Sequence, residues 1–216
     1  MVQSLIWFGG TSMVKREIRE ISRGRNLRSI KKNIYISCEG DAEENYLKGL
    51  KKCFSRKANI KISNSKRTAA KDVVKNLITR YKSEYQKGDL KYCIFDSDEN
   101  SKQALDDAKK LADKIGAKII YSNPCFEIWL LWHYEKDFSI QDSRENLKRK
   151  IEHLIKIEYW NSVNLYDIVN QKLNTAQMNY LQRKAELENY NIPFYSKESN
   201  PYTNFDELLN DLFTLK

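Results

Sequence analysis

Four short apolar runs, separated by longer segments with helical spacing, dominate the pattern of this chain. The runs are rich in the β-branched and aromatic residues that strands favour. Between them, apolar residues recur every three or four positions, which is typical of amphipathic helices. Strands are therefore predicted at Ile34–Cys38, Ile60–Ser63, Lys91–Asp96 and Lys118–Tyr121. Helices are predicted at Asp41–Phe54, Ala69–Gln86 and Lys102–Ile115.

The alternation of strands and helices predicts an α/β fold with parallel strands. Gly40 permits a tight turn after the first strand, and Asp41 with Glu44 has the spacing of a capping box at the next helix. Gly116 stands where glycine commonly terminates a helix. The run KYCIFD is almost continuously apolar, as a central strand covered on both faces requires.

The second half of the chain is predicted to be helical. Pro124 precedes the apolar segment CFEIWLLWHY, which indicates a helix with one acidic residue, Glu127, and with His133 in a structural role. Charged helices follow from about Gln141, and the tail ends in one more short helix. We expect three parts: a basic N-terminal arm at 1–33, an α/β core at 34–135, and a helical extension at 136–216 that packs on the sheet in the same domain.

The balance of charge favours an anionic partner. Lys and Arg number 38 against 29 Asp and Glu, which gives a formal net charge of +9. Such a charge suits a nucleic acid, because contacts to phosphates dominate the affinity of these complexes. Residues 11–33 are either a solvated arm or a strip that holds a phosphate backbone or an acidic partner. The candidate phosphate-binding residues are Arg23, Arg25, Arg28, Lys66, Arg67 and Lys71.

Other patterns argue against several classes of protein. The four cysteines are widely spaced without a CxxC pair, which argues against a zinc site and favours a reducing compartment. The N-terminal segment lacks the basic leader of a signal peptide. No apolar run approaches the roughly 20 residues that cross a bilayer. A cytoplasmic protein with no membrane partner is expected, and the sequence leaves its oligomeric state open.

Carboxylates stand at the ends of two predicted strands. Glu39 follows the first strand, Asp96 ends the third, and Asp98 lies just beyond it. Ligands of open α/β sheets bind beyond the carboxyl ends of the strands. Carboxylates gathered there repel one another and require a cation, and Mg²⁺ prefers such oxygen ligands. Glu43, one helical turn after Glu39, could face the same crevice.

Two cations about 3.5–4 Å apart could stabilise the attacking and leaving oxygens of a phosphodiester displacement. Taken one at a time, these motifs have simpler explanations: Glu39 could cap a turn, and residues 96–98 could form a polar loop. Their joint position at strand ends favours the metal site.

Four segments together resemble the RloB-like family of the Toprim (topoisomerase–primase) superfamily. They occur in order over about residues 30–215: CEGDAEENY, FDSDEN, NPCFEIWLLWHY and SNPYTNFDELLNDLF. The resemblance implies a Toprim-like parallel sheet of about four strands flanked by helices. It also implies a Mg²⁺ or Mn²⁺ site formed by one Glu and two Asp.

The same resemblance implies a role for each acidic residue. Glu39 would be a metal ligand or the general acid/base, and Asp96 and Asp98 would be the two metal-binding aspartates. Glu43 matches a second metal-binding glutamate of related nucleases. Glu127 is an additional candidate, although an exposed residue or the buried partner of a cation would explain it as well.

The function implied by the resemblance is a metal-dependent nuclease that hydrolyses DNA or RNA, tRNA included, as the effector of an antiviral, abortive-infection defence system. Its catalytic residues would be Glu39, Glu43, Asp96 and Asp98. The sequence has no P-loop motif (GxxxxGK followed by Ser or Thr), so ATP hydrolysis would come from a partner ATPase. A second hypothesis is a non-catalytic Toprim-shaped module that binds nucleic acid or a partner. A third is a phosphatase with Asp96 as nucleophile, which lacks the downstream Ser or Thr motif of such enzymes.

Overall fold

The computed structural model describes residues 31–97, 100–141, 143–157 and 163–215. The chain divides into two compact units, 1–30 and 31–216, and all described residues belong to the second. Arg23, Arg25 and Arg28 of the predicted N-terminal arm lie outside the described residues, and so does Asp98.

Within the described residues, one sheet has five strands in the order β2-β1-β3-β4-β5. The first four strands are parallel, and β5 is antiparallel to β4. The predicted α/β fold, with a parallel sheet flanked by helices, is confirmed, and the short fifth strand is an addition to it. The strands span Lys32–Cys38 (β1), Ala58–Asn64 (β2), Leu90–Asp96 (β3), Lys118–Asn123 (β4) and Tyr202–Thr203 (β5).

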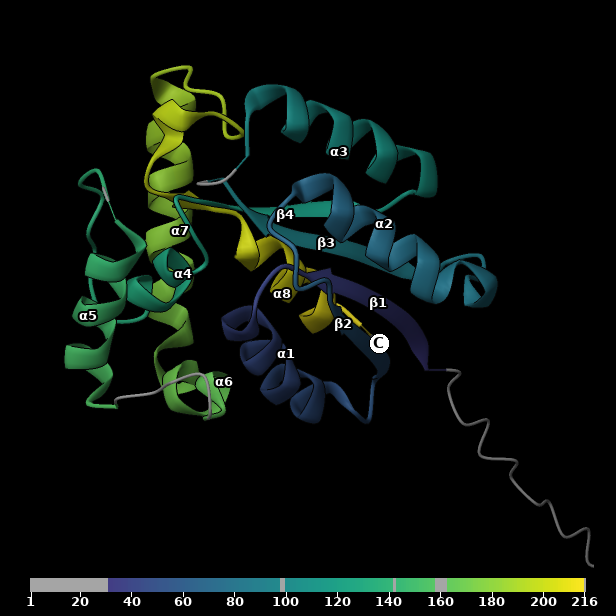
Figure 1. Cartoon of the computed structure of the whole chain (residues 1–216). Coiled ribbons are helices and arrows are strands. Elements are labelled where there is room, and N and C mark those ends of the chain that lie inside the picture. The colour runs from purple at the N-terminus through teal and green to yellow at the C-terminus, as the bar shows by residue number, and fades with distance from the viewer. Residues whose placement is uncertain (1–30, 98–99, 142, 158–162, 216) are drawn as a thin grey trace, which may run out of the picture. The chain divides into compact units, whose positions relative to one another are not determined.

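The direction of the crossovers reverses at β1. From β1 the chain crosses through α1 (Asp41–Phe54) to β2 on one side, and then through α2 (Ala70–Tyr81) to β3 on the other. The helix α1 lies on one face of the sheet, whereas α2 and α3 (Lys102–Ile115) lie on the opposite face (Figure 1). In open α/β sheets such a reversal opens a crevice at the carboxyl ends of the two strands concerned. Here those strands are β1 and β3.

The first helices differ from the prediction at two places. The predicted helix 69–86 ends at Tyr81, followed by a 3-10 turn, η1 (Lys82–Glu84), because Tyr85 turns back to pack its ring 5.1 Å from that of Tyr35. The capping box is also wrong: Gly40 is the N-cap of α1 and has no side chain to donate or accept. The carboxylate of Glu44 instead pairs with Lys48 Nζ at 2.8 Å.

The helical second half packs on the sheet as predicted. Its apolar helix α4 begins at Glu127, two residues later than expected, and all six of its residues are buried. The Trp129 ring stacks on Phe205 of α8 at 5.6 Å, and Tyr46 of α1 meets Phe205 edge-on at 5.2 Å. The elements span Glu127–Trp132 (α4), Arg144–Ile155 (α5), Leu165–Val169 (α6), Asn170–Lys172 (η3), Leu173–Asn189 (α7), Lys197–Ser199 (η4) and Phe205–Phe213 (α8).

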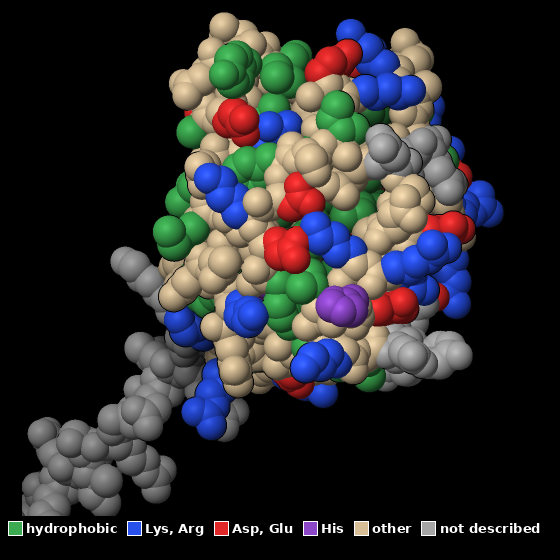
Figure 2. Space-filling model, turned by 90° about the vertical axis from the view of Figure 1, so that its left-hand side faces the viewer, with side chains coloured by type: hydrophobic (Ala, Val, Ile, Leu, Met, Phe, Trp, Pro, Cys, Tyr) green, Lys and Arg blue, Asp and Glu red, His purple; other side chains and the backbone are tan. Residues whose placement is uncertain are grey.

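None of the helices in the described ranges is long and apolar enough to cross a membrane. The face that carries α5 has Lys and Arg side chains interspersed with Asp and Glu, so its basic charge is scattered (Figure 2).

Candidate metal centre

Two acidic residues meet where the crossovers reverse. Glu39 directly follows β1, and Asp96 is the last residue of the neighbouring parallel strand β3. The backbone N–H of Asp96 donates a hydrogen bond to Glu39 Oε2 at 3.1 Å. Both side chains are buried, with 5% and 2% of their surface exposed. Glu39 and Asp96 therefore lie side by side at the ends of the two strands, as expected.

Glu43 joins this pair because α1 starts immediately after Gly40. Its carboxylate is buried, and a Cβ atom added to Gly40 would lie only 2.9 Å from Glu43 Oε2. Glycine at position 40 thus makes room for the carboxylate next to the turn. The three acidic residues in the first turn of α1 also lie at its positive dipole end, where negative charge is stabilised.

Glu127 completes the acidic cluster from the other half of the chain. As the first residue of α4 it is 7% exposed, and it lines one cavity with Glu39, Glu43 and Asp96. The cavity has a volume of about 240 Å³. Four of the five predicted acidic site residues are therefore brought together, and the fifth, Asp98, lies outside the described residues.

Two basic residues that were not predicted line the same cavity. Arg144 and Lys148 come from α5, one helical turn apart, and Arg144 Nη2 donates to Asp96 Oδ2 in an ion pair. Ser143 is the N-cap of α5, where its side chain accepts a hydrogen bond from the Asn146 N–H. The sequence pattern of this helix shows only that its apolar residues, such as Leu147 and Ile151, face inward, and it does not distinguish these two cations from the other basic residues.

Burial changes the proton affinity of the cluster. It is the main reason that the pKa of Asp96 is raised well above its usual range, and the three nearby glutamates add to the increase. The Arg144 guanidinium opposes it. Burial likewise raises the pKa of Glu43 from 4.5 to about 7, helped by Glu127 and opposed by backbone N–H groups. Without a further cation, Asp96 and Glu43 therefore resist full ionisation at neutral pH.

The chemistry of the cavity fits a hard divalent cation. Glu43 Oε1 and Asp96 Oδ1 are buried and have no hydrogen-bond partner among the described residues, which is unusual for buried polar atoms. A cation would supply that partner and relieve the repulsion between carboxylates. Across those same residues, no three Asp, Glu, His or Cys side chains are already arranged as metal ligands. A cation at Asp96 Oδ2 would replace its ion pair with Arg144.

The backbone beside Asp96 is held on both sides. The side-chain Nδ2 of Asn100 donates to the Asp96 carbonyl at 2.9 Å, and its Oδ1 accepts from the N–H of Ala70 at 2.9 Å. Ser97 donates its N–H to the Ser122 carbonyl at 2.8 Å. Neither anchor was predicted, although both lie in or next to the FDSDEN motif. They link the end of β3 to the start of α2 and to β4.

The predicted phosphate-binding residues lie away from the acidic cavity. Lys66, Arg67 and Lys71 are all exposed and do not line it. Arg67 Nη1 lies 3.5 Å from Asp72 Oδ2, and Lys71 Nζ lies 3.9 Å from an Asp107 carboxylate oxygen. Their binding role remains a prediction.

Comparison with known proteins identifies the family. Residues 34–212 match the family model described as RloB-like protein, and this range includes all the acidic residues of the cavity. Comparisons with curated proteins and with solved structures gave no match. The matched range covers most of the chain, from β1 into α8. The chain therefore belongs to the RloB-like protein family.

Proposed function

We propose that the acidic cavity binds Mg²⁺ or Mn²⁺ and that the protein hydrolyses phosphodiester bonds of a nucleic acid. The observation that carries this proposal is the gathering of four buried carboxylates at one sheet edge in a chain of net charge +9. Buried carboxylates are costly unless a cation or hydrogen bonds compensate them. Such a cluster is therefore expected to serve a cation, and a polyanionic substrate fits the overall charge.

Glu39, Glu43 and Asp96 are the residues that would hold the cation, together with Asp98. Bound there, a divalent cation supplies charge stabilisation at the phosphoryl oxygens and a more acidic water. Glu127 lines the same cavity and would add a further carboxylate near the cation. Arg144 and Lys148 bring positive charge to its mouth, where 41% of the Arg144 side chain is exposed. A guanidinium in this position can donate two parallel hydrogen bonds to a phosphate.

Membership of the RloB-like family supports the wider role as effector of an antiviral defence system. The missing P-loop motif means that ATP hydrolysis would require a separate partner ATPase. DNA and RNA, tRNA included, are both candidate substrates, because phosphate chemistry does not distinguish them.

One observation favours the alternative, a non-catalytic module that binds nucleic acid or a partner. The ion pair between Arg144 and Asp96 already neutralises part of the acidic cluster without any metal. In this alternative the cluster is structural, and binding survives removal of Asp96.

The deciding experiment is a cleavage assay on the full chain. Purified protein with Mg²⁺ or Mn²⁺ is incubated with labelled DNA and total tRNA, with and without the partner ATPase. Glu39→Gln and Asp96→Asn should lower the cleavage rate by about 10²–10⁴-fold, as is typical when a group essential to proton transfer or charge stabilisation is lost. Glu44→Gln is the matched control, since Glu44 lies on α1, next to Glu43 in the sequence, but outside the cavity. Cleavage by Glu39→Gln at the wild-type rate would refute the proposal.

A further inference from the structure

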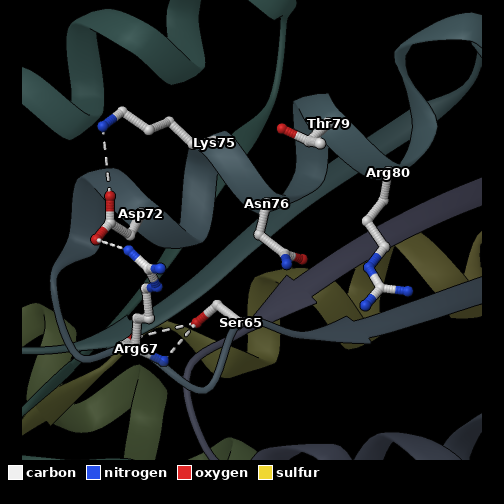
Figure 3. A pocket seen from close by; sticks show the side chains of 7 residues that line it. All are labelled: Ser65, Arg67, Asp72, Lys75, Asn76, Thr79 and Arg80. Carbon is white, nitrogen blue, oxygen red and sulfur yellow. Dashed lines mark hydrogen bonds and ion pairs between the residues drawn. The ribbon is translucent and has the colours of Figure 1, made fainter.

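A second cavity, of about 410 Å³, lies between α2 and the loop after β2 (Figure 3). We name it the β2–α2 pocket. Three of its lining residues are cationic, Arg67, Lys75 and Arg80, and one, Asp72, is anionic. Its net charge is thus positive, in contrast to the acidic cavity. The rest of the lining consists of Ser65, Asn76 and Thr79, so every lining side chain is polar.

The charges of this pocket are unevenly compensated. Asp72 is shared by Arg67, at 3.5 Å, and Lys75, at 3.4 Å. Arg80 has no ion pair within the described ranges, and in Figure 3 Asn76 lies between it and the Asp72 cluster. Arg80 is therefore the cation most available to an incoming anion.

The neutral side chains add hydrogen-bond donors. Ser37 Oγ donates to Asn76 Oδ1 at 3.1 Å, which fixes the amide so that its Nδ2 remains a donor. Thr79 also lines the pocket, but in Figure 3 its hydroxyl points away from the Arg80 guanidinium. A guanidinium and an amide N–H together are donors that typically hold a phosphate.

The pocket is linked to the acidic cavity through the backbone. The N–H of Ser65 donates to the carbonyl of Cys38, the residue before Glu39, at 2.9 Å. Asn100 Nδ2 contacts both the Thr68 carbonyl, at 3.1 Å, and the Asp96 carbonyl, at 2.9 Å. The loop of the pocket is thus fixed to both strand ends that carry the metal-site carboxylates, at the same edge of the sheet.

We propose that the β2–α2 pocket binds a backbone phosphate of a polynucleotide whose neighbouring segment reaches the acidic cavity. This inference rests on the proposed function for its substrate class. The lining offers no aromatic side chain on which a base could stack, and its donors match phosphate oxygens, which favours a backbone contact that is independent of sequence. Arg80 supplies the main charge, and Asp72 limits the affinity by neutralising Arg67 and Lys75.

The test is equilibrium binding of fluorescein-labelled tRNA and a labelled single-stranded DNA, measured by anisotropy in EDTA at several salt concentrations. Arg80→Ala should weaken binding of both by about 10–100-fold at low salt, the range of a lost charge-assisted hydrogen bond. The slope of log K against log[salt] should also be smaller in magnitude for Arg80→Ala than for the wild type by about one, which corresponds to one phosphate contact. Asp72→Asn should tighten binding, because it releases two cations. Arg56→Ala, an exposed arginine outside the pocket, should change binding less than twofold.

Several results would overturn the assignment. The first is that Arg56→Ala and Arg80→Ala weaken binding equally, and the second is that Asp72→Asn does not tighten it. The third is that the wild type does not bind either nucleic acid. The fourth is that AMP displaces the labelled nucleic acid as effectively as an unlabelled polynucleotide at the same total phosphate concentration. Thermal unfolding of each variant identifies a change that merely unfolds the protein. Because binding is measured in EDTA, its outcome is separate from cleavage. If Arg80→Ala loses binding and neither the wild type nor any variant cleaves, the proposed nuclease is refuted and the phosphate-binding pocket is supported. If the wild type cleaves and Arg80→Ala binds as tightly as the wild type, the nuclease is supported and the pocket is refuted.

Discussion

Replacing Glu43 by glutamine should stabilise the cation-free protein while weakening the proposed metal site. The Glu43 carboxylate is 4% exposed, and its Oε1 has no hydrogen-bond partner in the described part of the chain. Burial raises its pKa from 4.5 to about 7. Glutamine has nearly the same shape as the protonated carboxyl and never ionises, so it removes the cost of burying this charge.

The magnitude follows from the two pKa values. Below pH 4.5 the carboxyl is protonated in both the folded and the unfolded chain, so it contributes no pH dependence. As the pH rises, the unfolded chain loses this proton first, and the folded state becomes relatively less stable until about pH 7. At about 1.36 kcal/mol per pKa unit, the free energy of unfolding of the wild type falls by about 3 kcal/mol over this range, whereas that of Glu43→Gln does not. For a unit of this size, that corresponds to a difference of about 6–12 °C in Tm.

The assay is thermal unfolding of wild type and Glu43→Gln at pH 5 and pH 8, in EDTA and with saturating Mn²⁺. In EDTA the stability advantage of the variant should be small at pH 5 and largest at pH 8. Mn²⁺ should raise the Tm of the wild type, because it binds only the folded state, and should raise that of the variant less.

Glu44→Gln is the matched control with the opposite sign. Burial alone would raise the pKa of Glu44, but hydrogen bonds from Lys48 and Asn64 outweigh it and lower the pKa. Its loss should therefore destabilise the protein slightly above pH 4.5 and leave the Mn²⁺ effect intact. If Glu43→Gln were less stable than wild type at pH 8 in EDTA, the buried charge would not carry the cost assigned to it.

Two further predictions concern the core. An alanine at Gly49 would normally favour the helix, but its Cβ would lie 2.7 Å from Tyr166 Cβ, so Gly49→Ala should lower the free energy of unfolding in urea by about 1–3 kcal/mol. Burial lowers the pKa of His133 to about 4, and its Nδ1 lies 2.8 Å from the Trp129 carbonyl oxygen. As the pH falls below about 6.5, the unfolded chain gains this proton first, so the folded state becomes relatively less stable. Between pH 7 and pH 4 the free energy of unfolding should therefore fall by about 3 kcal/mol more in the wild type than in His133→Asn. Identical urea unfolding curves of the two proteins at both pH values would contradict this.

Much of the fold could be predicted because its signals are local. The sequence located β1 and α1 within two residues, since β1 is a short apolar run buried on both faces and α1 buries one face of a helical repeat. The meeting of Glu39 and Asp96 followed from the parallel arrangement alone, because carboxyl ends of parallel strands share an edge. Glu43 followed from the helical repeat.

The missing parts depend on contacts between distant residues. Arg144 reaches Asp96 across 48 positions of the sequence, and nothing in its helix marks it among 38 basic residues. The strand β5 is only two residues long, and it exists because Thr203 and Tyr202 pair with the end of β4. That pairing also extends β4 beyond its predicted end at Tyr121, since Ser122 and Asn123 gain partners.

The most direct test of the central claim is anomalous diffraction from crystals of the full chain grown or soaked with Mn²⁺. The account predicts an anomalous peak inside the acidic cavity, bordered by the carboxylates of Glu39, Glu43 and Asp96, with Arg144 displaced from Asp96. The peak should be absent from crystals of Asp96→Asn. A saturating soak that leaves the cavity without a peak and the Arg144–Asp96 ion pair intact would contradict the assignment of a metal centre.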